Sequence, residues 1–374
     1  MASAWYLLRQ YQQITTSLLF AALLTDAPTR DTLRRTFLSQ AGLADVGLQP
    51  LCPDASFRRY FRLATSDGQW LLMDAPPDYE NVDAFVRIAK HLATLGLRSP
   101  QIGKVDNANG FALIEDFGND TFTALLDAGE NEQTLYCYAI DVLTTLHQQA
   151  RATDLALPAY DLSAFMDEAL LMVDWYAPLV TGAKVIQTDR QRYQQIWKAI
   201  FEALPPPVTT LVLRDFHADN LMWIPGESPE GQIGLLDFQD ARIGPIAYDV
   251  VSLLEDARRD LNPELVNTMR RRYLKVMSLE DTENFNAWYR VLGAQRHCKV
   301  AGIFSRLALR DDKPAYLRHL PRVINLLQQH LGDPLLMPLA QWLDEIIPQR
   351  HALEPIGEIQ DLQGQLDITP PRTT

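Results

Sequence analysis

Three polar side chains set between short apolar runs constrain this chain more than any other feature. An apolar run leads into Asp215, Asn220 follows five residues later, and a further apolar run ends at Asp237, twenty-two residues after Asp215. Such runs predict short strands joined by turns, which would bring the three side chains to one point. Phosphoryl transfer requires a carboxylate that orients the acceptor hydroxyl and hard oxygen ligands that hold a divalent metal. The spacing therefore predicts a Mg-ATP site, with Asp215 as the catalytic residue and Asn220 and Asp237 as the ligands of Mg²⁺.

Each of these residues also has a purely structural interpretation. Asp and Asn favour turns, and an isolated Asp at the end of a strand is most often a cap. The linked strand–turn–strand context favours the catalytic interpretation for Asp215, Asn220 and Asp237. His217 lies two residues after Asp215, where we expect an imidazole that braces the loop rather than a catalytic one.

A second motif, Asp116-Phe117-Gly118, is a literal D-F-G tripeptide. In protein kinases the metal-binding D-F-G follows the catalytic loop, whereas here it precedes Asp215 by about a hundred residues. An apolar strand ends at Glu115, so we predict that this segment is the hinge between two lobes. The backbone at Glu115 and Phe117 would then meet the adenine edge of the nucleotide.

The usual phosphate-binding sequences, GxxxxGK and GxGxxG, do not occur in the chain. We predict instead that the turn at residues 54–57 covers the phosphates through its backbone N–H groups and the Ser56 hydroxyl. Arg58, Arg59 and Arg62 follow this turn. Alternation along a strand places one or two of these arginines on a solvated face, and we select Arg58 and Arg59 as candidate phosphate ligands.

Hydrophobic periodicity divides the chain into two parts. Five short β-like runs and a helical segment at residues 81–96 fill the first part, whereas helical patterns dominate after Asp120. This order predicts an α+β fold with a small antiparallel-sheet lobe that carries one helix and a larger, mainly helical lobe. The predicted divisions are an N-terminal extension at 1–25, a nucleotide-binding lobe at 26–118, a helical lobe with the catalytic and metal loops at 119–349, and a flexible tail at 350–374.

The charge balance excludes some classes of partner. With 47 acidic and 34 basic side chains, the net charge is −13 at pH 7, which disfavours nucleic acid and stable membrane association. Three distant cysteines without CxxC spacing predict reduced thiols and a cytoplasmic location. The apolar stretch at residues 14–24 is too short to span a bilayer, and we interpret residues 1–25 as an extension rather than a signal peptide. The sequence carries no signal of oligomeric state.

The Asp-x-His-x-x-Asn pattern of Asp215, His217 and Asn220, followed by Asp237, resembles the catalytic sequences of the aminoglycoside phosphotransferase and choline kinase superfamily. The resemblance implies a bilobal, protein-kinase-like fold and the use of ATP and Mg²⁺. Residues 244–249 are similar to the start of a helix in that superfamily, which implies that Asp249 braces the catalytic loop.

Residues 54–62 and 73–77 look most like a bacterial sugar-kinase branch of this superfamily. The resemblance implies a small-molecule sugar acceptor, namely the anomeric hydroxyl of N-acetylmuramate or N-acetylglucosamine in peptidoglycan recycling. An aminoglycoside or amino-alcohol kinase on the same scaffold and a non-catalytic nucleotide-binding regulator are the alternatives. An acidic sugar would require a cation near the acceptor, for which Arg242, Arg296 and Lys299 are candidates.

The chain departs from the superfamily pattern at two positions. The third strand lacks the Lys or Arg that contacts the α- and β-phosphates, and Met73 lies near the aligned position. Leu213 replaces the usual His before the catalytic loop. Either the arginines after Ser56 supply the missing positive charge, or metal holds the nucleotide. A non-catalytic regulator would also explain the missing Lys.

Overall fold

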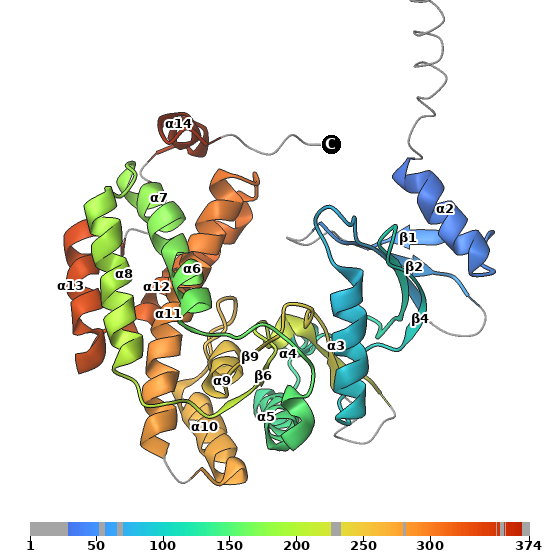
Figure 1. Cartoon of the computed structure of the whole chain (residues 1–374), viewed down its shortest axis with the longest axis horizontal. Helices are drawn as coiled ribbons and strands as arrows, with labels where there is room; N and C mark the ends of the chain where they lie inside the picture. The colour runs from blue at the N-terminus through green and yellow to red at the C-terminus, as the bar shows by residue number, and fades with distance from the viewer. Residues whose placement is uncertain are drawn as a thin grey trace, which may run out of the picture. The chain divides into compact units, whose positions relative to one another are not determined.

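The computed structural model forms two compact units, each described by itself (Figure 1). The first unit comprises the chain up to Val82 together with Ile102–Glu115, and the second comprises Asp83–Gln101 and the chain from Asp116 onward. The residues that the structure describes are 29–51, 57–65, 70–225, 233–279, 282–348, 350–351, 355 and 357–368.

The first unit is built on a five-stranded antiparallel sheet, as the sequence predicts, and its strand order is β1-β2-β3-β5-β4. The two central strands, β3 and β5, are mostly buried, whereas β1 and β4 at the edges are more exposed. The strands are β1 (Leu48–Pro50), β2 (Arg59–Leu63), β3 (Trp70–Asp74), β4 (Ile102–Asp106) and β5 (Phe111–Glu115).

Helix α2 (Arg30–Gln40) covers one face of this sheet (Figure 1). Thr29 caps its first turn by accepting the N–H of Thr32. The Phe37 ring stacks on Phe111 of β5 with centroids 5.5 Å apart. The buried core between helix and sheet consists of Phe37, Leu38, Leu63, Leu72, Phe111 and Leu113.

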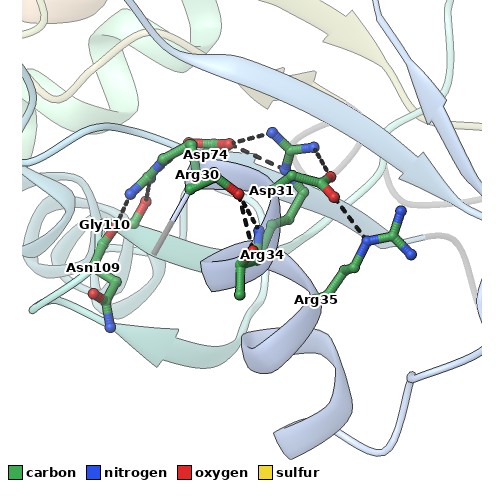
Figure 2. A network of polar contacts seen from close by, with 9 residues as sticks. Arg30, Asp31, Arg34, Arg35, Asp74, Asn109 and Gly110 are labelled. Carbon is green, nitrogen blue, oxygen red and sulfur yellow. Dashed lines mark hydrogen bonds and ion pairs between the residues drawn. The ribbon is translucent and has the colours of Figure 1, made fainter. Parts of the chain in front are cut away.

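The buried carboxylate of Asp74 fastens α2 to the end of β3 (Figure 2). It accepts the Nε–H of Arg30 at 2.7 Å and the Nη2–H of Arg34 at 3.0 Å. The Arg30 guanidinium also donates to the carbonyls of Asn109 and Gly110, in the turn between β4 and β5. The Asp74 carboxylate therefore joins α2 to β3, and Arg30 extends this connection to the neighbouring turn.

The second unit is mainly helical, and α11 (Thr282–Leu309) is its central element. This helix contacts α6, α9 and α12, and its residues are buried on every side rather than along one stripe. The α-helices of the unit besides α11 are α3 (Val82–Thr94), α4 (Phe122–Asp127), α5 (Glu132–Gln148), α6 (Leu162–Leu171), α7 (Ala177–Thr181), α8 (Gln187–Glu202), α9 (Ala247–Leu254), α10 (Pro263–Met277), α12 (Leu320–His330), α13 (Met337–Ile346) and α14 (Ile359–Gln365).

Short helical turns and two small sheets complete the second unit. The β6 strand pairs antiparallel with β9, and β7 pairs antiparallel with β8. Within the described ranges, none of the helices combines the length and the apolar character that a membrane crossing requires. The remaining elements are β6 (Thr209–Val212), β7 (Leu221–Trp223), β8 (Ile233–Leu235), β9 (Arg242–Pro245), the 3₁₀ turns η1 (Ala150–Thr153), η3 (Ala218–Asn220), η4 (Pro314–His319) and η5 (Pro334–Leu336), and the π-helical turn η2 (Met172–Tyr176).

Two segments differ from what the sequence pattern indicates. The helical pattern extends over residues 245–260, whereas α9 begins after Pro245, which pairs with β6 as part of β9, and ends at Leu254. The predicted tail at 350–374 contains α14, in which Leu362 is buried and the Gln363 amide donates to the carbonyl of Leu309 at 2.8 Å. In α14 one leucine is buried among mostly polar residues, so the sequence lacks the apolar periodicity that predicts a helix.

Replacing Asp74 with Asn should lower the free energy of unfolding by about 3 kcal/mol, because Arg30 and Arg34 would lose their buried anion. Equilibrium urea unfolding measures the change. The matched control is Asp31→Asn, since Asp31 also pairs with Arg34 but its side chain is 56% exposed, and we expect a change within about 0.5 kcal/mol. Equal effects of the two substitutions would show that Asp74 does not anchor α2.

Candidate active site

The side chain of Asp249, on the first turn of α9, holds the segment that leads into Asp215. It is fully buried, and its two oxygens accept the backbone N–H of Leu213 at 2.6 Å and of Arg214 at 2.8 Å. Burial raises the pKa of Asp249 to about 7, although both backbone bonds act in the opposite direction. Asp249 thus lies where the bracing role inferred from the resemblance requires it.

The residue before Asp215 is fixed at both of its backbone groups. Arg214 has φ of 72°, a left-handed conformation that costs a residue with a side chain about 1 kcal/mol or more. Ser252, three residues after Asp249 on α9, donates its hydroxyl to the Arg214 carbonyl at 3.1 Å. Arg296 of α11 in turn donates to the Ser252 hydroxyl at 2.8 Å. Nothing in the local sequence pattern points to Ser252.

The structure brings Asp215, Asn220 and Asp237 into one region of the second unit. The Asn220 amide N–H donates to the backbone carbonyl of Asp215 at 2.9 Å. The Leu236 N–H donates to the backbone carbonyl of Asn220 at 3.0 Å, which places Asn220 beside the residue that precedes Asp237. Pairing of β7 with β8 produces this closeness, because it sets the ends of the two strands side by side.

The donor atoms at this corner suit a magnesium ion. The amide nitrogen of Asn220 is committed to Asp215, so its oxygen is the atom left to face a metal. Asp237 adds a carboxylate, and Gln239 donates to one of its oxygens at 3.0 Å. Amide and carboxylate oxygens are ligands that Mg²⁺ prefers. Asp219, by contrast, accepts the Thr123 hydroxyl at 2.5 Å and pairs with Arg258 at 3.4 Å.

His217 is a neutral structural residue of the loop. Its Nε2 lies 3.3 Å from the amide nitrogen of Asn220 and 3.2 Å from Nη1 of Arg258. Both partners can only donate, so Nε2 accepts and the ring proton is on Nδ1. Burial also lowers the pKa of His217. These contacts fit the bracing role that the sequence predicts for this imidazole.

The charge on Asp215 is set by the cations around it. Burial acts to raise the pKa of Asp215, but Lys299 and Arg214 act against it and hold the pKa below its usual value. Of the three candidate cations in the sequence, Lys299 and Arg296 both influence this carboxylate. Asp215 is therefore ionised at neutral pH.

The chain passes from the first unit to the second between Glu115 and Asp116, at the predicted hinge. The Asp116 carboxylate accepts the N–H of Gly118 at 2.9 Å and so closes its own turn. The Phe117 ring packs on Gly234 of β8, where an added Cβ would lie 2.6 Å from the ring. Contact of Glu115 and Phe117 with adenine stays a prediction.

The predicted phosphate ligands are placed unequally. Ser56 lies outside the described residues, and Arg58 forms an ion pair with Glu80 at 3.6 Å. Arg59 pairs directly with Asp74 in the β2–β3 register, which puts it on the face that α2 covers.

Strand alternation places Arg62 on the opposite face of the sheet from Arg59. Tyr60 pairs with Met73 and Arg62 with Leu71, so Arg62 shares a face with the position where the superfamily has a Lys. Alternation along residues 59–63 separates Arg62 from Arg59, but only the strand register shows which of the two shares a face with Met73.

A second polar cluster lies where α9 ends against α11 and α12. Among the described residues, Glu255, His297 and His330 offer ligand atoms within 4.8 Å of one another, as a metal site would. Both imidazole Nε2 atoms lie 2.7 Å from the same oxygen of Glu255, however. Hydrogen bonds account for the arrangement, and we assign it a structural role.

Comparison with known protein families and with curated proteins gives one consistent result. Residues 47–290 match the family described as "Phosphotransferase enzyme family". The chain is 33% identical to the N-acetylmuramate/N-acetylglucosamine kinase of Caulobacter vibrioides, over 87% of this chain and 99% of that protein. It is 37% identical to the kinase of the same name from Neisseria meningitidis serogroup B, over 76% of this chain and 86% of that protein.

Solved structures share the fold at low sequence identity. A choline kinase from Streptococcus pneumoniae superimposes with a TM-score of 0.56 at 12% identity, over 83% of this chain and 99% of that chain. The gentamicin complex of APH(2″)-IIa superimposes with a TM-score of 0.55 at 14% identity, over 82% of this chain and 97% of that chain. The α+β, protein-kinase-like fold expected from the sequence is confirmed.

The Glu255 cluster should make the protein sensitive to acid. Burial acts to raise the pKa of Glu255, but His330 and His297 hold it far below its usual value, whereas burial lowers the pKa of His297. A depressed carboxylate pKa stabilises the fold fully above the unfolded pKa of about 4.3, and that stability is lost progressively as the pH falls below this value and through the lower pKa of the folded state. Because burial keeps His297 neutral, its contribution to the stability of the fold is also lost as the pH falls, below about pH 6.5.

We expect Glu255→Gln to lower the free energy of unfolding by about 1–3 kcal/mol at pH 7. The difference in free energy of unfolding between Glu255→Gln and the unsubstituted protein should shrink as the pH falls from about 5 to about 3. Urea unfolding at a series of pH values measures both, with Glu264→Gln on the exposed start of α10 as the control. Parallel stability profiles for Glu255→Gln and the unsubstituted protein would contradict the assignment.

Proposed function

The chain belongs to the phosphotransferase enzyme family, and from that premise we propose that it is an ATP-dependent kinase whose acceptor is a small-molecule sugar. The convergence of Asp215, Asn220 and Asp237 carries this proposal. The three side chains that the chemistry requires come from separate parts of the sequence, and backbone pairing holds them together. A cytoplasmic location fits this activity, because ATP is available there.

The acceptor that we propose is the anomeric hydroxyl of N-acetylmuramate or N-acetylglucosamine. Relatives that carry both sugars in their names match this chain at 33–37% identity over three quarters or more of its length. The choline kinase and the aminoglycoside enzyme share the fold at 12–14% identity, which supports the scaffold and not the acceptor. An amino-alcohol or aminoglycoside acceptor is therefore the second candidate.

In the proposed reaction Asp215 accepts a hydrogen bond from the sugar hydroxyl. The hydroxyl oxygen attacks the γ-phosphorus of ATP, the bond to the bridging oxygen breaks, ADP leaves, and the hydroxyl proton passes to Asp215. The transition state of such transfers is loose, so the proton moves late and an ordinary carboxylate is a sufficient base. Asp249 and Ser252 contribute by fixing the backbone of Arg214, the residue before the base.

Asn220 and Asp237 would hold Mg²⁺ through their side-chain oxygens. The ion supplies positive charge against the phosphate oxygens when it is bound. The chain's own contribution is to present these oxygens on the turn between paired strands, with Asn220 oriented by its bond to Asp215. Phosphate contacts from Ser56 and Arg58, and adenine contacts at the hinge, belong to the same proposal.

Asp215→Asn should reduce kcat by about 10²- to 10⁴-fold, because the amide cannot take the hydroxyl proton. The KM for ATP should change little, since Asp215 contacts the acceptor. Asp237→Ala should instead raise the KM for Mg-ATP at least about tenfold, because a metal ligand is lost. Steady-state kinetics with varied ATP and sugar separate the two effects.

Asp219→Asn is the control for both substitutions, because Asp219 lies in the same loop but is held by Thr123 and Arg258. Its kcat should stay within a few-fold of the unsubstituted enzyme. Turnover close to normal in Asp215→Asn, or normal Mg-ATP affinity in Asp237→Ala, would overturn the role assigned to that residue.

A panel assay tests the proposed function itself. Purified protein with Mg-ATP is given N-acetylmuramate, N-acetylglucosamine, kanamycin or choline, and the release of ADP is followed. We expect turnover with the two sugars only. Turnover with kanamycin or choline alone would replace the sugar with a cationic acceptor, and ATP binding without transfer to any acceptor would favour a regulator.

A further inference from the structure

A buried carboxylate beside the catalytic loop is shared by two cations. Glu168 of α6 pairs through its Oε1 with Nη2 of Arg214 and, at 3.1 Å, with Nζ of Lys299. Its other oxygen accepts the hydroxyl of Tyr160 at 2.6 Å. Two positive side chains thus share one carboxylate oxygen, so Glu168, Arg214 and Lys299 together carry a net positive charge.

A third cation lies on the same side of this group. Arg242 of β9 donates to the carbonyl of Ala159 at 3.0 Å, and its guanidinium lies 5.9 Å from the centre of the Tyr160 ring. The guanidinium of Arg214 lies 5.4 Å from the same ring. Arg214 and Arg242 therefore both lie near Tyr160, and the hydrogen bond between Tyr160 and Glu168 connects them to Lys299.

The burial of these side chains makes the surplus charge costly. Lys299 is 6% exposed, and its ammonium bonds only to Glu168 and, at 3.2 Å, to the hydroxyl of Tyr248 among the contacts described. A buried ammonium is stable when it is paired and hydrogen-bonded. Lys299 shares Glu168 with Arg214, so this carboxylate balances the ammonium charge only in part. The Arg214 and Glu168 side chains are 16% and 13% exposed, so the group is not sealed from a ligand.

The group is adjacent to the proposed base. Arg214 immediately precedes Asp215 in the chain, and both Arg214 and Lys299 act on the Asp215 carboxylate. The nearby negative charges are Glu168 and Asp215, and the latter is reserved for the acceptor hydroxyl. Asp240 contributes only its backbone carbonyl to Arg214, while its carboxylate accepts Gln239. An anionic group on the acceptor would complete the charge balance here.

We propose that Lys299, Arg214 and Arg242 form an anion subsite that binds the carboxylate of an acidic acceptor sugar. This inference rests on the proposed function. N-acetylmuramate carries a lactyl carboxylate, whereas N-acetylglucosamine has a hydroxyl on the same ring carbon, so the subsite favours the acid sugar. Lys299 is a specificity-determining residue in this arrangement, and Glu168 positions it.

The test compares Lys299→Met, which keeps the length of the side chain and removes its charge, with Lys198→Met. Lys198 is on the exposed face of α8, 61% exposed and paired only with Glu202. KM and kcat are measured with N-acetylmuramate, with N-acetylglucosamine and with N-acetylmuramate whose lactyl carboxylate is converted to an amide. The amide keeps the bulk of the lactyl group and lacks its charge.

We expect Lys299→Met to raise the KM for N-acetylmuramate by about 10- to 100-fold, the value of a charge-assisted bond. Because Lys299 also acts on the Asp215 carboxylate, kcat should fall by the same factor with all three sugars. The KM values for N-acetylglucosamine and for the amide should stay within about threefold of those of the unsubstituted enzyme, and Lys198→Met should change neither kcat nor KM. A rise in KM that is equal for all three sugars, or no rise in the KM for N-acetylmuramate, overturns the inference.

A second variant keeps the test decisive if Lys299→Met does not fold. Arg242→Gln changes a half-buried side chain of β9, and the same selective rise in KM for N-acetylmuramate is expected. Unchanged selectivity in Arg242→Gln would overturn the subsite. An unsubstituted enzyme that phosphorylates neither sugar would instead overturn the proposed function, a result distinct from loss of selectivity in an active enzyme.

Discussion

Two backbone N–H groups bound by one buried carboxylate determine the conformation on which this site depends. Asp249 fixes the amide nitrogens of Leu213 and Arg214, and Ser252 of the same helix fixes the carbonyl of Arg214, directly before Asp215. Because α9 is buried and contacts α11, these bonds tie a loop to the rigid interior of the helical unit. The left-handed conformation of Arg214 persists because the structure around it determines it fully.

Charge is the second constraint on the site. Burial alone would favour a neutral Asp215, and the cations of α11 and of Arg214 reverse that preference. The same cations need negative partners, which the fold supplies through Glu168. The proposed base, the cations around it and their counter-ion thus form one electrostatic unit, and a change in one member alters the others. Such coupling explains why a buried lysine can be retained beside an active centre.

The sequence predicts the parts of the site that depend on local pattern. The apolar runs that lead into Asp215 and Asp237, and the run that follows Asn220, identify the strands and turns of the site, and five short β-like runs identify the five-stranded sheet. The contact between Arg296 and Ser252 joins residues 44 positions apart, and no periodic pattern reports it. The sequence does not predict β9, because Gly244-Pro245 is typical of a break in regular structure. An edge strand next to a tight contact nevertheless accommodates both residues.

The close approach of Phe117 to Gly234 has a practical consequence for engineering. Any side chain at position 234 would collide with the ring, so either the aromatic group or strand β8 would have to shift. The strand continues directly toward Asp237, and a shift would be transmitted to this proposed metal ligand. Mutant libraries that aim to broaden the range of acceptors should therefore keep this glycine invariant.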